Sequence, residues 1–371
     1  MCATQIRHKL PDDPGPGDIS WFKGQNAFEQ TEIKRQVAFK RTNWPDLPNG
    51  PFVKLPNHTY PHILPTNNEA LAFFPGFSSD VLTYMAENDI AIHSEALNLK
   101  SSQVACLNFL FPLRLNLSLA SKVLRYLDVF QNIKSVENIE FEYTGQDETN
   151  RTNQPFTEWL GEPKSGKRGQ NRTSIDAAIF WTDKQNASHI TLIEWKYTER
   201  NFGVCSAFEK ASPEKKASCQ TINVLDDPAS LCVVAGDGRN CGRHYWDHIS
   251  AAGISLKKLS TVVGCPFQGP FYQVMRQFLM AHFLRKNDVA DEVDVIVVEF
   301  EGNESLRKVP PQLNSLGMGI PKTVVEVWNS ALADRTPPLR VITAEDLISA
   351  YDFHSELDLR WRQYIINRYD V

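Results

Sequence analysis

The sequence lacks several features that would place it in common functional classes. It has no run of about 18 apolar residues, so we expect no segment that spans a membrane. It has no G-x-x-x-x-G-K-[ST] motif, which excludes a P-loop motor, and no G-x-S-x-G motif, which excludes the nucleophile elbow of many hydrolases. Its first residues contain no apolar stretch typical of a signal peptide. We therefore expect a cytoplasmic protein that does not associate with membranes.

The composition is that of a folded chain. Of its 371 residues, 42% are hydrophobic and 22% are charged, which allows a sizeable core and argues against wholesale disorder. The formal net charge of -5 argues against a basic protein that coats nucleic acid. It does not exclude a local basic strip beside an acidic site.

The cysteines contain no C-x₂-C pair, so a zinc ribbon is not indicated. Cysteine is nevertheless dense in one region, and disulfides are disfavoured in the cytoplasm. This density is compatible with a structural Zn²⁺ or iron–sulfur site and equally with unconnected buried thiols. The candidate metal-binding thiols are Cys205, Cys219, Cys232 and Cys241.

The first 76 residues are rich in proline and weakly periodic, with turn signals such as DDPGPGD and NWPDLPNGP. We interpret residues 1–76 as an irregular N-terminal arm. Trp21 and Trp44 indicate that the arm docks on the remainder of the chain. Residues 77–371 then form the main domain, with a Cys-rich insertion of short helices at about 200–266.

Periodicity in the main domain predicts alternating helices and strands. The segments 77–129, 268–285, 321–333, 343–351 and the C-terminal tail have helical patterns, whereas 136–143, 174–199, 293–300 and 339–342 have strand patterns. Ser101 or Ser102 can cap a helix that Pro112 ends or kinks. This order predicts an α/β fold with one mixed central sheet flanked by helices.

The segment Ser174–Glu199 reads as two apolar strands with three charged residues. In an extended strand side chains alternate, so Glu194 and Lys196 share one side and Trp195 points to the other. If the strands pair as a hairpin, Asp176 reaches the same place. Two carboxylates and an ammonium group together suit a Mg²⁺ or Mn²⁺ site for phosphodiester hydrolysis. An ordinary surface Glu–Lys pair is the competing interpretation, but charges within an apolar strand are costly unless paired or metal-bound.

Two further groups of polar residues flank this segment. Gln273 and Arg276 lie three residues apart on a predicted helix and share a face, either at the site or on a solvated surface. A polar loop precedes the hairpin, and its basic residues fit either phosphate contacts or a solvated loop. These basic residues are Lys164, Lys167, Arg168 and Arg172.

The pattern ID at 175–176 followed by EWK at 194–196 resembles the core motif of the PD-(D/E)xK, restriction-endonuclease-like nuclease superfamily, with Ile175 in place of Pro. Five segments resemble one branch of this superfamily, which has uncharacterised prokaryotic members. They are SSQVACLNFLFPL, IEFEY, RTSIDAAIFW, LIEWKYTE and FYQVMRQFLMA. The similarity covers roughly residues 90–300.

The resemblance implies a restriction-endonuclease-like fold and Mg²⁺-dependent cleavage of nucleic acid. Asp176 and Glu194 would ligate the metal, and Lys196 would position or help deprotonate water and offset charge in the transition state. A glutamine at the position of Gln273 contacts the active-site lysine or a phosphate in relatives. Some relatives hold an iron–sulfur cluster with four cysteines.

The sequence departs from the superfamily because the helix that often carries a glutamate has none. Gln103, Asn108 or Glu142 then remain as candidates for the third metal ligand. Glu199 lies three residues after Lys196. If the strand continues, its side chain is expected to point away from the side that carries Lys196.

We conclude that the chain is expected to be a metal-dependent nuclease, with DNA favoured and prokaryotic defence implied by the resemblance alone. The alternatives are a catalytically inactive nucleic-acid-binding protein of the same fold and a protein centred on its cysteine cluster. A homodimer and a larger defence complex are both left open as assemblies.

Overall fold

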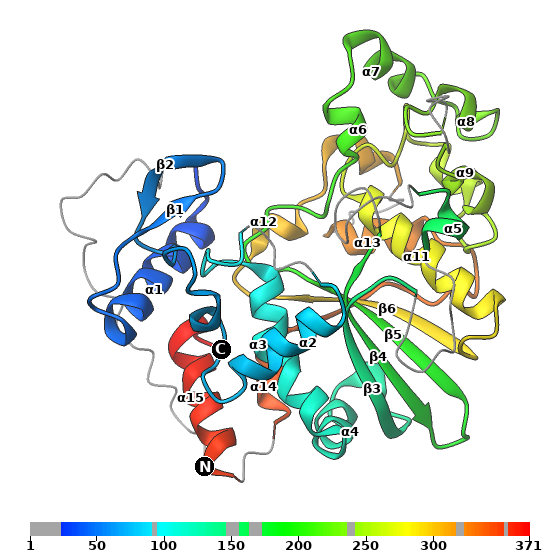
Figure 1. Ribbon diagram of the computed structural model, residues 1–371. Helices are drawn as coiled ribbons and strands as arrows, with labels where there is room; N and C mark the ends of the chain where they lie inside the picture. Colours follow the sequence, from blue (N-terminus) through cyan, green and yellow to red (C-terminus); the bar gives the residue numbers. More distant parts are fainter. Residues whose placement is uncertain are drawn as a thin grey trace.

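The architecture was determined from a computed structural model, which describes residues 24–90, 95–145, 156–162, 173–235, 242–316, 323–351 and 355–371. A five-stranded mixed sheet lies at its centre, with helices on both faces (Figure 1). The predicted α/β class and the mixed central sheet are therefore confirmed.

The sheet has the strand order β3-β4-β5-β6-β7. The first three strands form an antiparallel meander, and β6 and β7 continue it in parallel with β5. The strands are β3 (Ile133–Tyr143), β4 (Ile175–Asp183), β5 (Ser188–Trp195), β6 (Glu292–Glu299) and β7 (Arg340–Thr343). Residues of β4, β5 and β6 are almost all buried, which explains their continuous apolar runs.

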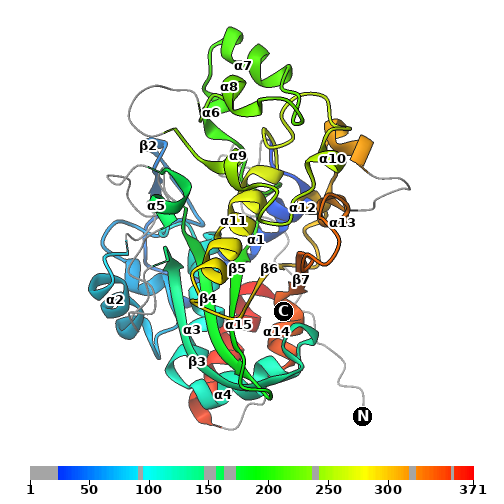
Figure 2. The same ribbon diagram turned by 90° about the vertical axis from the view of Figure 1, so that its right-hand side faces the viewer.

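The two faces of the sheet carry two separate hydrophobic cores. Figures 1 and 2 show α3 and α4 on one face and α11 on the other. The first core is built with α2 (Ser78–Glu87), α3 (Ser102–Leu115), α4 (Leu117–Arg125), η3 (Asp128–Phe130), α14 (Ala344–Ser349) and α15 (Glu356–Tyr369). The second is built with α5 (Phe156–Leu160), α11 (Phe271–Lys286), α12 (Glu304–Arg307), η4 (Pro311–Leu316) and α13 (Val324–Ser330).

The N-terminal arm is more regular than predicted. Within the expected irregular segment 1–76, Ala27–Asn43 forms the 17-residue helix α1, so that prediction is wrong there. A capping box starts the helix, because Asn26 and Glu29 each bond the backbone of the other. Its apolar periodicity is weak because α1 buries polar side chains against α15, and Gln36 Nε2 donates to the Arg368 carbonyl at 2.8 Å. The arm also contains β1 (Gly50–Phe52), β2 (Leu55–Tyr60) and η2 (Glu69–Ala72).

Helix α3 continues through Pro112 to Leu115 instead of ending there. A proline lacks the N–H that would bond the carbonyl four residues earlier, here that of Asn108. The indole Nε1 of Trp361 donates to this carbonyl at 2.8 Å, so α15 supplies the missing donor. Ser101 caps the start of the helix through the Val104 N–H.

The insertion after β5 consists of short helices, as predicted, and it forms a lobe beyond one end of the sheet (Figure 2). These helices are α6 (Ser206–Glu209), α7 (Pro213–Gln220), α8 (Pro228–Leu231), α9 (Tyr245–His248) and α10 (Leu256–Leu259). Among the described residues, no single helix is long and apolar enough to span a membrane. Helices α3 and α4 meet the length and hydropathy criteria only when they are taken together, and the chain bends by 114° between them.

Candidate active site

A cleft of about 660 Å³ opens at the end of the sheet where β5 stops. The start of α3, the first turn of α11 and the start of α1 form its walls. Both acidic and basic groups line it. Its charged lining consists of Glu29, Lys54, Glu95, Lys100, Glu142, Asp176, Glu194, Lys196, Glu199, Arg200 and Arg276.

The β4–β5 hairpin brings Asp176 to the end of β5. Ala177 pairs with Ile193 in the antiparallel register, which places Asp176 next to the last residues of β5. The Trp195 N–H donates to Asp176 Oδ2 at 2.7 Å. The Trp195 side chain points to the opposite face and packs on Phe109 of α3, with ring centroids 5.0 Å apart. Strand alternation therefore separates the polar and apolar side chains here.

Glu194 and Lys196 meet on the face that α11 covers. Lys196 Nζ lies 2.6 Å from Glu194 Oε1 and donates to Gln273 Oε1 at 3.0 Å. Gln273 Nε2 donates back to Glu194 Oε1 at 2.5 Å. Gln273 thus holds both charged groups, and its Oε1 also accepts from the Gly203 N–H at 2.7 Å.

The sequence interpretation missed a second glutamine on α11. Gln277 Nε2 donates to Glu194 Oε2, so each carboxylate oxygen of Glu194 has an amide donor. Gln273 and Gln277 are spaced four apart and therefore project from the same helix face. The spacing of four residues from Gln273 was the available signal.

The electrostatics of the cleft differ between the lysine and the aspartate. Burial alone lowers the pKa of Lys196, but the carboxylates of Glu194, Glu199 and Asp176 outweigh it and raise the pKa above its ordinary value. Burial, and then the charges of Glu194 and Glu142, raise the pKa of Asp176 well above its ordinary value. Lys196 is therefore held as a cation, while the site opposes ionisation of Asp176 unless a further positive charge lies beside it.

Glu142 lies at the same end of the sheet in an unusual backbone conformation. Its φ is +49°, a left-handed value that costs a non-glycine residue on the order of 1–3 kcal/mol. Register pairs of β3 and β4 on either side place Glu142 opposite Asp176. Gln103 Nε2 and Ser174 Oγ donate to its two carboxylate oxygens at 2.7 and 2.9 Å. Such strain is retained where the surrounding structure fixes a side chain at a site.

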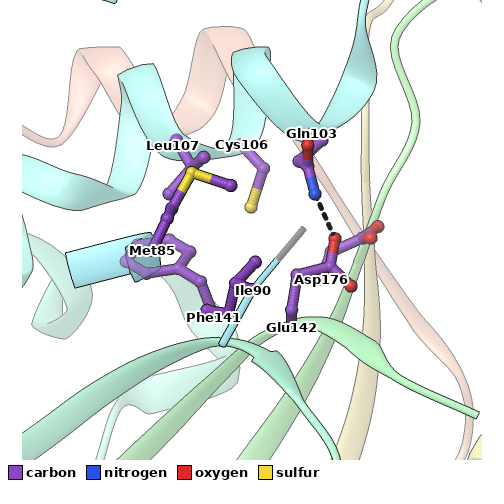
Figure 3. A pocket seen from close by; sticks show the side chains of 8 residues that line it. All are labelled: Met85, Ile90, Gln103, Cys106, Leu107, Phe141, Glu142 and Asp176. Carbon is purple, nitrogen blue, oxygen red and sulfur yellow. Dashed lines mark hydrogen bonds between the residues drawn. The ribbon is translucent and has the colours of Figure 1, made fainter. Parts of the chain in front are cut away.

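Figure 3 shows Glu142 and Asp176 beside each other, with Gln103 across from them. A small hollow lies next to these carboxylates, and its wall is otherwise apolar, formed by Met85, Ile90, Cys106, Leu107 and Phe141. Low-polarity surroundings of this kind account for the cost of charging Asp176.

Glu199 lines the cleft, so the expectation that it faces away is wrong. Strand β5 ends at Trp195 and the chain then bends, which breaks the alternation on which that expectation rested. Glu199 Oε2 accepts from the Tyr197 N–H at 2.8 Å, and Glu199 Oε1 accepts from Ser102 Oγ at the start of α3.

Asn108 does not line the cleft, which removes it as a candidate metal ligand. It is fully buried in the core, where it accepts from the Phe74 N–H at 2.9 Å. Its Nδ2 donates to the Ala72 carbonyl at 3.0 Å. Gln103 does lie at the cleft, and it contacts Glu142 there.

Arg276 reaches the cleft from the helix turn after Gln273. Its Nε donates to Thr173 Oγ1 at 2.7 Å and lies 3.5 Å from Glu162 Oε1. Tyr245 of the insertion also donates to Glu162 Oε1, at 2.7 Å. The guanidinium group is therefore oriented by a buried network, at the edge of the cleft.

The donor set of the cleft suits a hard divalent ion. Among the described residues, no three His, Cys, Asp or Glu side chains converge closely enough to hold a metal ion. Mg²⁺, however, keeps several waters and is often bound by one or two carboxylates together with substrate phosphates. Asp176 and Glu194 both line the cleft, and a cation beside Asp176 would lower the cost of charging its carboxyl group.

Several sequence-predicted residues lie outside the described residues. They are Lys164, Lys167, Arg168, Arg172 and Cys241. The other three candidate cysteines, Cys205, Cys219 and Cys232, line one cavity in the insertion, where the fourth cysteine is Cys265.

A comparison with protein families gives one match. The family model described as restriction endonuclease associating with ARP matches residues 22–370. Comparisons with the curated proteins and with the solved structures found no match.

Proposed function

Since the chain belongs to the family of restriction endonucleases associating with ARP, we propose that it is a metal-dependent nuclease that hydrolyses phosphodiester bonds of DNA. The observation that carries this proposal is the meeting of Asp176, Glu194 and Lys196 at the end of one hairpin, inside a cleft. The match to nearly the whole chain supports a substrate of the restriction-endonuclease class.

Asp176 and Glu194 would hold the divalent ion, which supplies a polarised phosphoryl oxygen and a water of lowered pKa when it is bound. Glu142 lies opposite Asp176, so it is the described carboxylate best placed to assist as a third acidic group. Its contacts with Gln103 and Ser174 keep it oriented toward this end of the sheet.

Lys196 acts as a fixed cation rather than as a base. Its raised pKa keeps the ammonium group protonated at neutral pH, so it can donate to the phosphate as negative charge develops in the transition state. Gln273 and Glu194 position this ammonium group. In the hydrolysis, the oxygen of water attacks phosphorus and one P–O bond to a sugar oxygen breaks, leaving a phosphomonoester and a hydroxyl group.

Basic side chains of the cleft can bind the flanking phosphates. Arg276 stands at the edge of the cleft beside Gln273, and Lys100 and Arg200 lie on the α1 side. Glu29 of α1 contacts both Lys100 and Arg200. Arg200 Nε donates to Glu29 Oε2 at 2.6 Å, and Lys100 Nζ lies 3.7 Å from Glu29 Oε1. Phosphate contacts of this kind position nucleic acid without reading its sequence.

One observation favours a second candidate, a protein that binds DNA without cleaving it. The first turn of α3 carries Ser102 and Gln103, and no acidic residue occurs there. A non-cleaving protein would still shift DNA in a binding assay, so binding and cleavage have to be measured together.

Cleavage assays test the proposal. We expect the purified chain to cut plasmid DNA with Mg²⁺ or Mn²⁺ and to stop when EDTA is added, with single-stranded DNA and RNA as comparison substrates. Lys196→Ala should lose cleavage by about 10³-fold, because a charge that stabilises the transition state is removed. Lys184→Ala, at the exposed far end of the same hairpin, is the matched control and should cleave like the wild type.

Equal cleavage by Lys196→Ala and wild type would overturn the proposed role of the cleft. DNA binding without cleavage under any divalent ion would favour the second candidate. The family name also records association with ARP, and we propose that this chain likewise works within a complex, which co-purification would reveal.

A further inference from the structure

The cysteines of the insertion gather around one cavity. Four of the five cysteines in the described residues line the same space of about 20 Å³, beneath aromatic side chains such as Phe267. All four are buried, with exposures between 3% and 8%, and none is in a disulfide. They are Cys205, Cys219, Cys232 and Cys265.

Backbone contacts between distant segments bring these thiols together. The Cys265 N–H donates to the Cys219 carbonyl at 2.8 Å, and the Cys205 N–H donates to the Gln268 carbonyl at 3.3 Å. The residue before Cys265 is Gly264, with φ +78°. A Cβ at this position would lie only 2.8 Å from the Gln220 carbonyl oxygen, so a glycine is needed for the close approach.

The thiols influence one another across the cavity. Burial, and then the neighbouring thiol of Cys232, raise the pKa of Cys265 well above its ordinary value. Burial is also the main cause of the raised pKa of Cys205 and Cys219, and Cys232 contributes to both. Cys205, Cys219 and Cys265 are therefore favoured as neutral thiols when no metal is bound.

We propose that Cys205, Cys219, Cys232 and Cys265 form a four-thiolate site for a soft metal centre, a Zn²⁺ ion or an iron–sulfur cluster. Four cysteines are a complete ligand set for either. Buried free cysteines are common, but here four of them, from four separate segments, line one cavity. This site is separate from the proposed nuclease cleft and stands without it.

Metal binding completes the site. In the described residues, no three side chains converge closely enough to hold a single ion. Metal binding would therefore require the thiols to move closer together, and each sulfur would release one proton on bonding to zinc or iron. The cavity has room for about one water-sized body, and its lining includes the flexible side chain of Met275, which can yield to a larger cluster.

Metal analysis of the full chain tests this inference. Protein purified without oxygen is treated either with Zn²⁺ or with a mixture of ferrous and ferric iron together with sulfide, and excess metal is then removed. We expect about one zinc ion per chain, or iron and sulfide in about equal amounts with brown colour. Co²⁺ in place of Zn²⁺ should give the visible bands of tetrahedral cobalt thiolate. A chain that retains neither metal after both treatments would overturn the proposal.

Variants identify the ligands. Cys265→Ser should lower the retained metal by about tenfold or more, because an alcohol is a poor ligand for a soft ion. Cys106→Ala, which removes a buried thiol from the other core, should retain as much metal as wild type. Unchanged metal content in Cys265→Ser, or loss of the metal in Cys241→Ser, would overturn this ligand set. The wild-type metal content still decides the proposal if Cys265→Ser fails to fold.

Discussion

Two regions of this molecule that bury charged and polar side chains differ in kind, and one of the two is the candidate active site. The first region is the cleft with Asp176, Glu194 and Lys196. The second is the seam where α1 and α3 pack on α15, which buries Glu32, Asn108 and Arg368.

The seam satisfies its polar groups from within the protein. Arg368 is fully buried, and its guanidinium group bonds the backbone carbonyls of Ala72 and Leu99. Glu32 accepts from the Tyr197 hydroxyl at 2.5 Å and pairs with Arg35 at 3.4 Å. In the cleft, by contrast, Asp176, Glu194 and Glu142 line one open space with Lys196, and burial, followed by the charges of Glu194 and Glu142, raises the pKa of Asp176. Burial of charge alone therefore does not mark a site, whereas uncompensated charge beside a cleft does.

The largest expected effect separates the two regions by activity. Asp176→Asn should lower the single-turnover cleavage rate by about 10³-fold or more, because the amide loses the negative charge that favours a cation. Its melting temperature in EDTA should stay at or above that of wild type, because an amide oxygen can still accept from the Trp195 N–H and a repelling charge is gone. If Asp176→Asn instead has a lower melting temperature than wild type and cleaves DNA at the wild-type rate, Asp176 stabilises the fold and is not part of the active site.

The seam should respond in the opposite way. Asn108→Ala should lower the free energy of unfolding by about 3 kcal/mol, because it leaves the buried Phe74 N–H without its acceptor and removes one of the donors to the Ala72 carbonyl. Chemical denaturation measures the change, with the exposed Asn314→Ala as control. Below its melting temperature, Asn108→Ala should cleave at the wild-type rate. If Asn108→Ala loses cleavage but keeps the wild-type free energy of unfolding, the structural role assigned to Asn108 is wrong.

Glu32 gives the seam a pH dependence. Burial raises its pKa to about 7, despite the lowering effects of Arg35 and Tyr197. Because the folded state favours the protonated form, the stabilisation is complete below the ordinary pKa of 4.5 and is lost as pH rises through about 7. Wild type should therefore lose on the order of 2 kcal/mol of unfolding free energy between pH 5 and 8, relative to Glu32→Gln.

Denaturation at the two pH values tests this expectation. Glu87→Gln, which alters an exposed carboxylate, should follow wild type. Glu345, whose pKa burial also raises to about 7, is retained in all these proteins, so the difference isolates Glu32. Identical pH dependence in wild type and Glu32→Gln would contradict the account of the seam.

The smallest expected effect concerns a positioning residue in the cleft. Gln273→Ala should lower kcat about tenfold, or about 1.4 kcal/mol in activation free energy, because Lys196 and Glu194 lose a shared partner. KM should change little, because Gln273 holds other side chains rather than DNA. Gln185→Ala at the exposed hairpin tip is the control. A rise in KM with unchanged kcat would show instead that Gln273 contacts the substrate.

Local patterns predicted much of the fold. The period of two in the β4–β5 segment and the cap at Ser101 are short-range signals, and the structure shows both. Helix α1 was missed because it buries Glu32 and Gln36, so its helical face is not apolar. Its partners, such as Arg368, lie more than 300 residues away and are invisible to a local pattern.

The same limit applies to the candidate site. Asp176, Glu194 and Lys196 could be grouped because a hairpin relates them by local geometry. Glu199 was misplaced because the bend after Trp195 has no strong sequence signal. Cys265 was left out of the cysteine set because tertiary contacts, not spacing, bring it beside Cys219.

Binding of Mn²⁺ tests the central claim most directly, because it reports on the cleft carboxylates without requiring a substrate. Free Mn²⁺ is measured by electron paramagnetic resonance as wild type, Asp176→Asn, Glu194→Gln and Lys184→Ala are titrated, with DNA bearing uncleavable phosphorothioate linkages present and absent. We expect wild type and Lys184→Ala to bind Mn²⁺, and each carboxylate variant to bind it at least about tenfold more weakly. Equal Mn²⁺ affinity in wild type, Asp176→Asn and Glu194→Gln would contradict the assignment of these carboxylates as the metal site.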